Sequence, residues 1–313
     1  MSNSVLFKSS IAKKYFMALT GLFLCTFLVG HLLGNLQLIF NTGEEGRRAF
    51  NEYAYFMGHN IFIKVLSYTT YIALIVHAVD GIMLTIQNKK ARPVKYAYNN
   101  PKANSGTASR NMAILGTLIL VFLATHMANF WWKAKITEEI PLHVKTIEKS
   151  YQQQNPMTGQ VTNIRYQINH LLTTKGEYIP ISVKDLEHDT YVNPQTGESV
   201  QGNDTCFVKI KDGFHVYDKN TNLNIGEAYK DLHTVVMTFF SKENSNALFG
   251  VIFYVISMIV LGYHLWHGFA SAFQSLGLNH PLYMPIIKKI GMAFSIVVPF
   301  LFAIIPIIIY MNH

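Results

Sequence analysis

Five stretches of the chain are apolar enough and long enough to cross a lipid bilayer as helices. A membrane-spanning helix needs about 20 mostly apolar residues in a row, and charged residues are scarce within each of these stretches. We predict spans at Tyr15 to Phe40, Asn60 to Ile86, Met112 to Trp132, Ala247 to Phe273 and Ile290 to Tyr310. The pattern therefore predicts an all-α integral membrane protein built on a five-helix transmembrane bundle.

One long hydrophilic segment, Lys133 to Asn246, separates the third span from the fourth. It contains "TCFVKIKDGFHVYDK", in which apolar and polar residues alternate on either side of Asp212 and Gly213. This alternation around a turn sequence is typical of a β-hairpin. We therefore expect three regions: 1–132 with the first three spans, 133–246 as a β-containing insert, and 247–313 with the last two spans.

The positions of the basic residues predict the orientation in the membrane. The net charge is +8, and lysine and arginine crowd the amino-terminal segment, the loop "NKKARPVKYAYNNPKANSGTASR" and the segment before the last span. Short cytoplasmic loops carry such an excess of basic residues. We predict a multi-pass protein of the bacterial cytoplasmic membrane, with its amino terminus in the cytoplasm and the insert outside it. The same pattern explains the net charge without nucleic-acid binding.

Four of the five spans carry a histidine within apolar sequence. These residues are His31, His77, His126 and His264. An imidazole in lipid is costly unless it has a partner. A hydrogen bond to a neighbouring helix would explain a single case equally well, but four separate cases favour a common function.

The depths of the four histidines fall into two levels. With a rise of about 1.5 Å per residue, His31 and His126 lie about 21 to 24 Å from the cytoplasmic ends of their spans. His77 and His264 lie about 14 Å from those ends. Two pairs of imidazoles at two depths, each pair drawn from two helices, are what two bis-histidine b haems require. His267 lies one helical turn from His264 and is the alternative fourth ligand, which depth alone does not exclude.

Motifs around the histidines resemble a known family. They are "TGLFLCTFLVGH" in the first span, "HAVDG" followed by "KKARPVKYAY", "THMANF" in the third span, and "YHLWHG" before "SLG" in the fourth. They resemble the cytochrome b subunit of succinate dehydrogenases and quinol:fumarate reductases in its five-helix, two-haem form. In that family the fourth ligand stands four residues before a glycine, which matches His264 before Gly268. The resemblance covers all five spans and leaves the insert unexplained.

The resemblance implies a role in electron transfer, with two b haems as cofactors. It places the outer haem on the histidines of the first and third spans, and the inner haem on those of the second and fourth. A flavoprotein subunit would oxidise succinate and an iron–sulfur subunit would relay the electrons, both on the cytoplasmic side. This chain would pass them to a membrane quinone and would hold no succinate site. The two-haem relatives favour a low-potential quinone such as menaquinone, although no residue here identifies it.

Several further residues have two explanations each. Arg110, just before the third span, is expected either to pair with a propionate of the inner haem or to be an ordinary positive-inside residue. Relatives place polar groups near the propionates where this chain has Met17 and Ala18. Glu52 lies where the two-haem relatives place a carboxylate that handles quinol protons, and the alternative is a solvated loop carboxylate. Asp80 lies inside the second span and needs a partner or water.

Two other functions fit the same pattern of spans and histidines. One is the cytochrome b subunit of a formate dehydrogenase or hydrogenase. The other is a haem-free transporter whose histidines relay protons. A visible spectrum separates the transporter from both cytochromes, because b haem absorbs and a haem-free protein does not.

Overall fold

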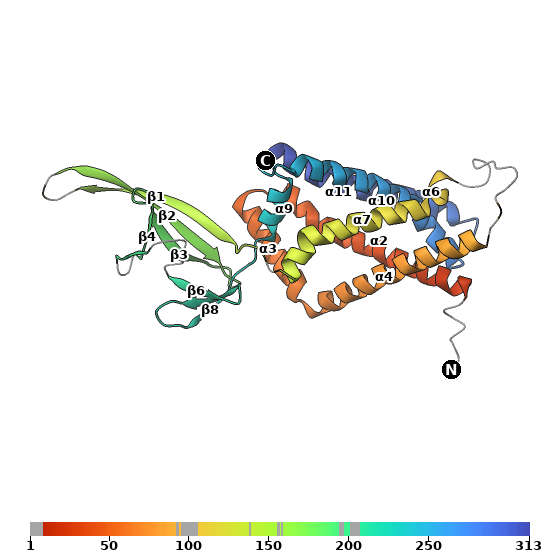
Figure 1. Cartoon of the computed structure of the whole chain (residues 1–313), viewed down its shortest axis with the longest axis horizontal. Coiled ribbons are helices and arrows are strands. Elements are labelled where there is room, and N and C mark those ends of the chain that lie inside the picture. Colours follow the sequence, from red (N-terminus) through yellow and green to blue (C-terminus); the bar gives the residue numbers. More distant parts are fainter. Residues whose placement is uncertain are drawn as a thin grey trace. The chain divides into compact units, whose positions relative to one another are not determined.

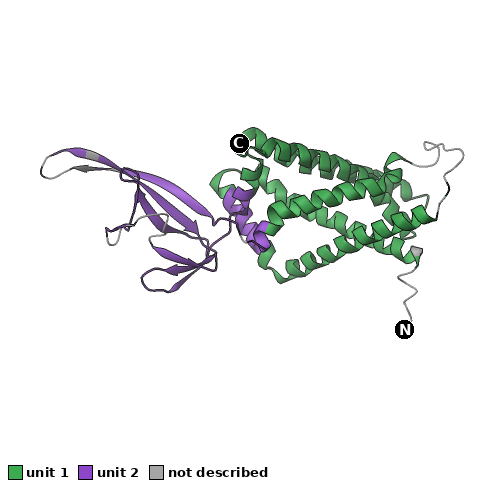
Figure 2. Ribbon diagram, in the orientation of Figure 1, with its two compact units in different colours: residues 1–46, 57–132, 236–313 green, residues 47–56, 133–235 purple. Residues whose placement is uncertain are grey.

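The computed structural model describes residues 9–91, 94, 106–137, 139–154, 157, 159–193, 197–200 and 207–313. Most of the basic loop after the second span lies outside these residues. The chain divides into two compact units (Figure 2). Unit 1 comprises residues 1–46, 57–132 and 236–313, and unit 2 comprises residues 47–56 and 133–235.

Unit 1 is built on five long apolar helices (Figure 1). They are α2 (Ser10–Phe40), α4 (Ile61–Lys90), α7 (Met112–His126) continued by the π-helix η1 (Met127–Trp132), α10 (Ala247–Ser275) and α11 (Met284–Asn312). All five are long and apolar enough to cross a membrane. The prediction of five apolar helices is therefore confirmed, and Asn60 at the edge of the second span caps α4 through its side chain.

The helices of unit 1 pack closely through small residues. Helix α2 contacts α4, α10 and α11, while α7 contacts α4 and α10, and α10 contacts α11. A Cβ atom at Gly262 would lie 3.0 Å from the backbone oxygen of Ser295, and one at Gly291 would lie 2.7 Å from Cδ1 of Phe269. Lipid gives no hydrophobic drive between membrane helices, so their association relies on such close contacts. These two glycines allow α10 and α11 to approach each other.

Large apolar side chains remain exposed along the five helices. Leu33, Ile75 and Phe249 are 63, 62 and 74 % exposed, respectively. Extended apolar surface of this kind is rare on monomeric water-soluble proteins. Together with the helix lengths, it indicates a multi-pass membrane protein.

Unit 2 contains two antiparallel sheets (Figure 1). The first runs in sequence order through β1 (Val144–Gln154), β2 (Val161–Leu172), β3 (Tyr178–Asp185), β4 (Thr190–Val192) and β5 (Ser199–Val200). The second contains β6 (Val208–Lys211), β7 (His215–Asp218) and β8 (Asn224–Glu227). The predicted β content of the insert is thus confirmed.

The predicted hairpin forms between β6 and β7. Asp212 and Gly213 have φ angles of 52° and 75°, and the N–H of Phe214 donates to the carbonyl of Lys211 at 3.2 Å. Two successive left-handed residues define the tight turn that matches the twist of a hairpin, and Asp and Gly tolerate that conformation best.

A small apolar core connects the two sheets of unit 2. Its buried members are Leu171, Ile181, Val208, Val216 and Ala228. Leu171 and Val216 are completely buried, and they come from different sheets. The two sheets therefore pack on a shared interior, as water-soluble β structure requires.

Two shorter helices extend across the boundary between the units. Helix α3 (Gly43–His59) follows α2, and α9 (Leu232–Phe240) precedes α10. The sequence leads us to expect a loop around Glu52, whereas the structure has helix α3 there. Its first turn carries Glu44 and Glu45 and its last turn His59, an arrangement that complements the helix dipole.

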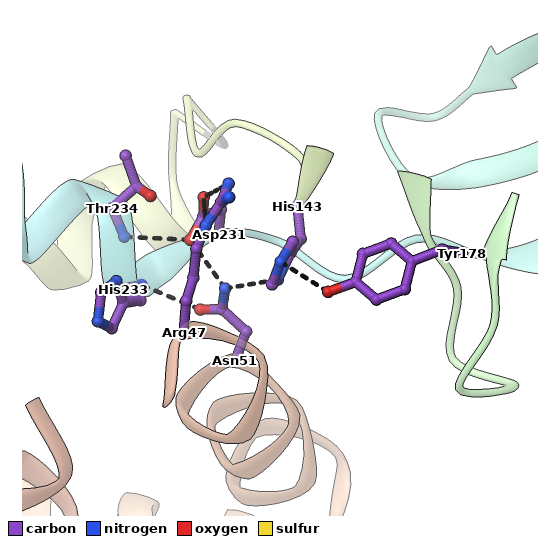
Figure 3. A network of polar contacts seen from close by, with 7 residues as sticks. All are labelled: Arg47, Asn51, His143, Tyr178, Asp231, His233 and Thr234. Carbon is purple, nitrogen blue, oxygen red and sulfur yellow. Dashed lines mark hydrogen bonds and ion pairs between the residues drawn. The ribbon is translucent and has the colours of Figure 1, made fainter. Parts of the chain in front are cut away.

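Within unit 2, Asp231 joins the start of α9 to α3 (Figure 3). Its carboxylate accepts hydrogen bonds from the N–H of Thr234 at 3.1 Å and from Nδ2 of Asn51 at 2.8 Å. Nε of Arg47 donates to it at 2.9 Å. The oxygen of the Asn51 side chain accepts the N–H of His233 at 2.9 Å. Asp231 and Asn51, the latter on α3, thus accept hydrogen bonds from the amides of Thr234 and His233 at the start of α9.

The same network reaches the start of the first sheet through His143. Nδ2 of Asn51 lies 3.0 Å from Nδ1 of His143, and the Tyr178 hydroxyl lies 3.4 Å from Nε2. An amide nitrogen only donates, so Nδ1 is the acceptor and the ring proton sits on Nε2. Burial alone would raise the pKa of Asp231, but the hydrogen bonds to its carboxylate outweigh burial and hold the pKa below its ordinary value. The network therefore contains a charged carboxylate paired with a guanidinium.

Replacing Asn51 with leucine will loosen the start of α9. Asn51→Leu removes the partners of the His233 amide and of one His143 nitrogen, and each buried unsatisfied polar group costs about 1–3 kcal/mol. Hydrogen exchange of the His233 amide is expected to accelerate at least about tenfold, since 1.4 kcal/mol is a factor of ten. Asn163→Leu, at an exposed position of β2, is the control and should leave it unchanged. Equal exchange in both variants would contradict the role of Asn51.

Candidate functional site

The four histidines of the apolar helices meet as two pairs in unit 1. The ring centroids of His31 on α2 and His126 on α7 are 5.9 Å apart, with an interplanar angle of 88°. Those of His77 on α4 and His264 on α10 are 6.2 Å apart, with an angle of 68°. Each pair joins two different helices. The two members of each pair are the histidines that the sequence predicts at the same depth in the membrane.

The two pairs are separate sites. Thr20, which contacts His77, lies about 16 Å along α2 from His31. Among the described residues, no group of three or more His, Cys, Asp or Glu side chains could hold a metal ion. Protein zinc sites use three or four protein ligands, whereas haem iron needs protein ligands only at its axial positions. Each pair therefore suits haem iron better than a bare metal ion.

The spacing within each pair also fits an iron between the rings. Histidine nitrogens lie about 2 Å from a bound metal, which places the centroids of two rings on opposite sides of one metal about 6 Å apart. The observed separations are 5.9 and 6.2 Å. The residues present thus fit two bis-histidine haems.

Hydrogen bonding fixes which nitrogen of His77 is available. Oγ1 of Thr20 lies 3.2 Å from Nδ1 of His77 and 2.7 Å from the carbonyl oxygen of Phe16. The hydroxyl has one proton, and the short contact directs it to the carbonyl, so Oγ1 accepts the proton of Nδ1. Nε2 of His77 keeps its lone pair, as a metal ligand must. A Cβ atom at Gly21 would lie only 3.2 Å from Cε1 of His77, so glycine lets the ring sit close to α2.

The ring of His126 is held by a tyrosine and surrounded by aromatic residues. The Tyr254 hydroxyl lies 3.2 Å from Nδ1 of His126, and Tyr254 is 8 % exposed. The π-helical turn η1 begins directly after His126, and such turns are frequent at functional sites. The phenylalanines around the pair are Phe27 and Phe302 beside His31, and Phe122 and Phe130 beside His126.

His264 differs from the other three because its Nδ1 is buried and has no hydrogen-bond partner. Buried polar atoms are normally satisfied, and exceptions need an explanation. This unpaired atom distinguishes His264 from His77 and His126, whose Nδ1 atoms have hydroxyl groups nearby. His267 is half-buried, and among the described residues the ring in contact with His77 is that of His264. The structure therefore favours His264 over His267 as the partner of His77.

Glu52 belongs to unit 2, where it lies on α3. Its Oε1 accepts a hydrogen bond from Nε of Arg48 at 2.7 Å, and Arg48 also donates to the carbonyl of Gly176 at 3.1 Å. Tyr55 lies one turn farther along α3, where burial and a hydrogen bond to Glu227 raise its pKa to about 12. Glu52 is thus a partly exposed carboxylate in an ion pair, and its role in proton transfer stays a prediction.

Arg110 and Asp80 occupy two different helices of unit 1. Arg110 ends the short helix α6 (Thr107–Arg110), is exposed, and has its guanidinium 3.4 Å from the Thr107 hydroxyl. Its pairing with a propionate stays a prediction. Asp80 on α4 is half-buried and interacts electrostatically with Lys13 and His77. The carboxylate is therefore within electrostatic range of a lysine of α2, without an ion pair or hydrogen bond between these two described residues.

Sequence reasoning missed Thr20 and Tyr254, and it considered Lys13 only as one of the basic residues that predict the orientation. All three are polar side chains within or beside apolar spans, which is the one signal that the sequence offers for them. Their contacts depend on how the helices are rotated against one another.

Comparison with known proteins adds no assignment. No family model, no characterised protein and no solved structure matches this chain. The function is therefore argued from the site itself.

If His31 and His126 hold a haem, removing the Tyr254 hydroxyl is expected to weaken its binding. Tyr254→Phe keeps the ring but leaves Nδ1 of His126 without its partner, and losing such an outer contact costs 10–100-fold in metal affinity. Haem retention by this pair, measured as haem loss to an acceptor protein, should fall within that range. Tyr263→Phe on the same helix, at an exposed tyrosine, is the matched control. Identical haem loss from the two variants would show that Tyr254 does not support the ligand.

Proposed function

We propose that this chain is the two-haem cytochrome b membrane-anchor subunit of a succinate:quinone oxidoreductase. The observation that carries the proposal is the meeting of His31 with His126, and of His77 with His264, at the spacing of axial haem ligands. Each pair joins two of the five apolar helices. Motifs in four of these helices resemble the same family, which supports the proposal independently of the geometry.

In this proposal His31 and His126 hold the outer haem, and His77 and His264 hold the inner haem. Bound haem b supplies one-electron transfer, because its iron alternates between the ferric and ferrous states. Thr20 and Tyr254 orient two of the rings and adjust their basicity as ligands. The phenylalanines beside His31 and His126 keep water away from that site, which influences the reduction potential.

The orientation follows from the basic residues. They gather at the start of α2, the end of α4 and the start of α11: Lys13, Lys14, Lys89, Lys90, Lys288 and Lys289. We place these ends in the cytoplasm, where the flavoprotein and iron–sulfur subunits would bind. Unit 2 would then face the other side of the bacterial cytoplasmic membrane. The apolar outer faces of the helices suit lipid and the tail of a quinone, for which the family resemblance favours menaquinone.

Visible spectroscopy of histidine variants tests the proposal. The reduced-minus-oxidised spectrum of the purified complex should show b-type bands from two haems per chain. His77→Ala or His264→Ala should remove the inner haem, because that haem loses one of its two axial bonds, and should spare the outer haem. His31→Ala or His126→Ala should do the reverse. His267→Ala is the control and should retain both haems.

A colourless preparation would refute the proposal and favour a haem-free transporter. Copurification with a flavoprotein and an iron–sulfur protein distinguishes it from a cytochrome b of a formate dehydrogenase or hydrogenase, which would accompany a molybdenum or nickel enzyme.

A further inference from the structure

Lys13 is a buried lysine near the amino-terminal end of α2. It is 6 % exposed, whereas the next residue, Lys14, is exposed. Its side chain is mostly buried, although its nitrogen is not among the fully buried atoms, and a partly buried ammonium group without a partner costs free energy. In the described part of the chain, no hydrogen bond or ion pair to this ammonium group is found, and Asp80 acts on it only electrostatically. Lys13 therefore calls for an anionic partner.

Lys13 lies on the face of α2 that contacts His77. Residues 13, 17 and 20 follow the spacing of one helical face. On this face Oγ1 of Thr20 is 3.2 Å from Nδ1 of His77, and Cε of Met17 would lie 3.5 Å from a Cβ atom at Gly81 on α4. Lys13 continues the same face about 10 Å farther along α2. The distance from Thr20 to Lys13 along α2 is therefore comparable to the distance from a haem iron to the propionate carboxylates at the edge of the haem.

This end of the bundle has more positive than negative charge. Asp80 is the single acidic residue within the five apolar stretches of the sequence. Several lysines lie at the same helix ends: Lys13 and Lys14 on α2, Lys89 and Lys90 on α4, and Lys288 and Lys289 on α11. Haem b carries two carboxylates, which form strong charge-assisted hydrogen bonds with ammonium groups. The charge surplus suits such a ligand.

We propose that Lys13 binds a propionate carboxylate of the inner haem. This inference rests on the proposed function, because it requires a haem between His77 and His264. A lipid phosphate offers the same anionic oxygens, and it is accessible to Lys14 at the surface. The burial of Lys13, and its place on the His77 face, favour the haem carboxylate.

The reduction potential of each haem in the purified complex tests this proposal. Lys13→Met leaves a propionate charge uncompensated and makes the inner haem harder to reduce. We expect about a tenfold shift in its reduction equilibrium, which is about 59 mV for one electron, and no change in the outer haem. Lys13→Gln should give the same shift, and Lys13→Arg should preserve the potential. Lys14→Met is the matched control, and His77→Ala identifies the signal of the inner haem.

Three results would overturn the proposal while two b haems are still present in the wild type. The first is an inner-haem potential that is the same in Lys13→Met and Lys14→Met. The second is a shift of equal size in the potentials of both haems in Lys13→Met. The third is an equal loss of both haems from Lys13→Met and from Lys13→Gln. A shift that appears only when anionic lipid is present would instead assign Lys13 to a lipid phosphate. A wild-type complex without b haem would refute the proposed function itself, and the haem count reveals this before any potential is measured.

Discussion

An imidazole inside an apolar helix has to be bonded to something, and this requirement organises unit 1. Each of its four membrane-depth histidines faces a histidine of another helix, and together the pairs involve α2, α4, α7 and α10. Hydroxyl groups lie at Nδ1 of His77 and of His126. When Nδ1 carries the ring proton and donates it to such a hydroxyl group, Nε2 keeps the lone pair that a metal ligand needs. Close packing through glycine, as at Gly262, gives the helices one well-defined rotation.

The sequence predicts the features that depend on local patterns. Long apolar runs identify the five helices because lipid requires about 20 apolar residues per crossing. The constant rise of a helix then fixes the relative depths of His31, His77, His126 and His264 without any knowledge of packing. The turn at Asp212 is predictable because few residues adopt left-handed backbone angles. Helix α3 escapes prediction because it contains many polar residues and because one of them, Asn51, is completely buried.

Features that depend on contacts between distant residues are not predictable from local patterns. Asn51, His143 and Asp231 are far apart in the sequence, yet they share one buried network. Thr20 illustrates the same limit in the membrane unit. A threonine in a helix commonly bonds a carbonyl one turn earlier, as Thr20 does with Phe16. Its additional contact with His77 exists only because α2 and α4 are rotated toward each other, which no spacing within α2 reveals.

Each unit contains buried histidine nitrogens without a hydrogen bond, among them Nδ1 of His170 and His215 in unit 2 and Nδ1 of His264 in unit 1. In unit 2 the buried network contains an acid, a base and an amide that satisfy one another, which makes a dry polar interior tolerable. Among the described residues of unit 1, Nδ1 of His264 is the buried side-chain atom that lacks a hydrogen bond. Lys13, which is 6 % exposed and acts electrostatically on Asp80, lies on the helix face that contacts His77. Lys13 therefore lies toward the His77 and His264 pair, where a carboxylate of the proposed haem would supply its anionic partner.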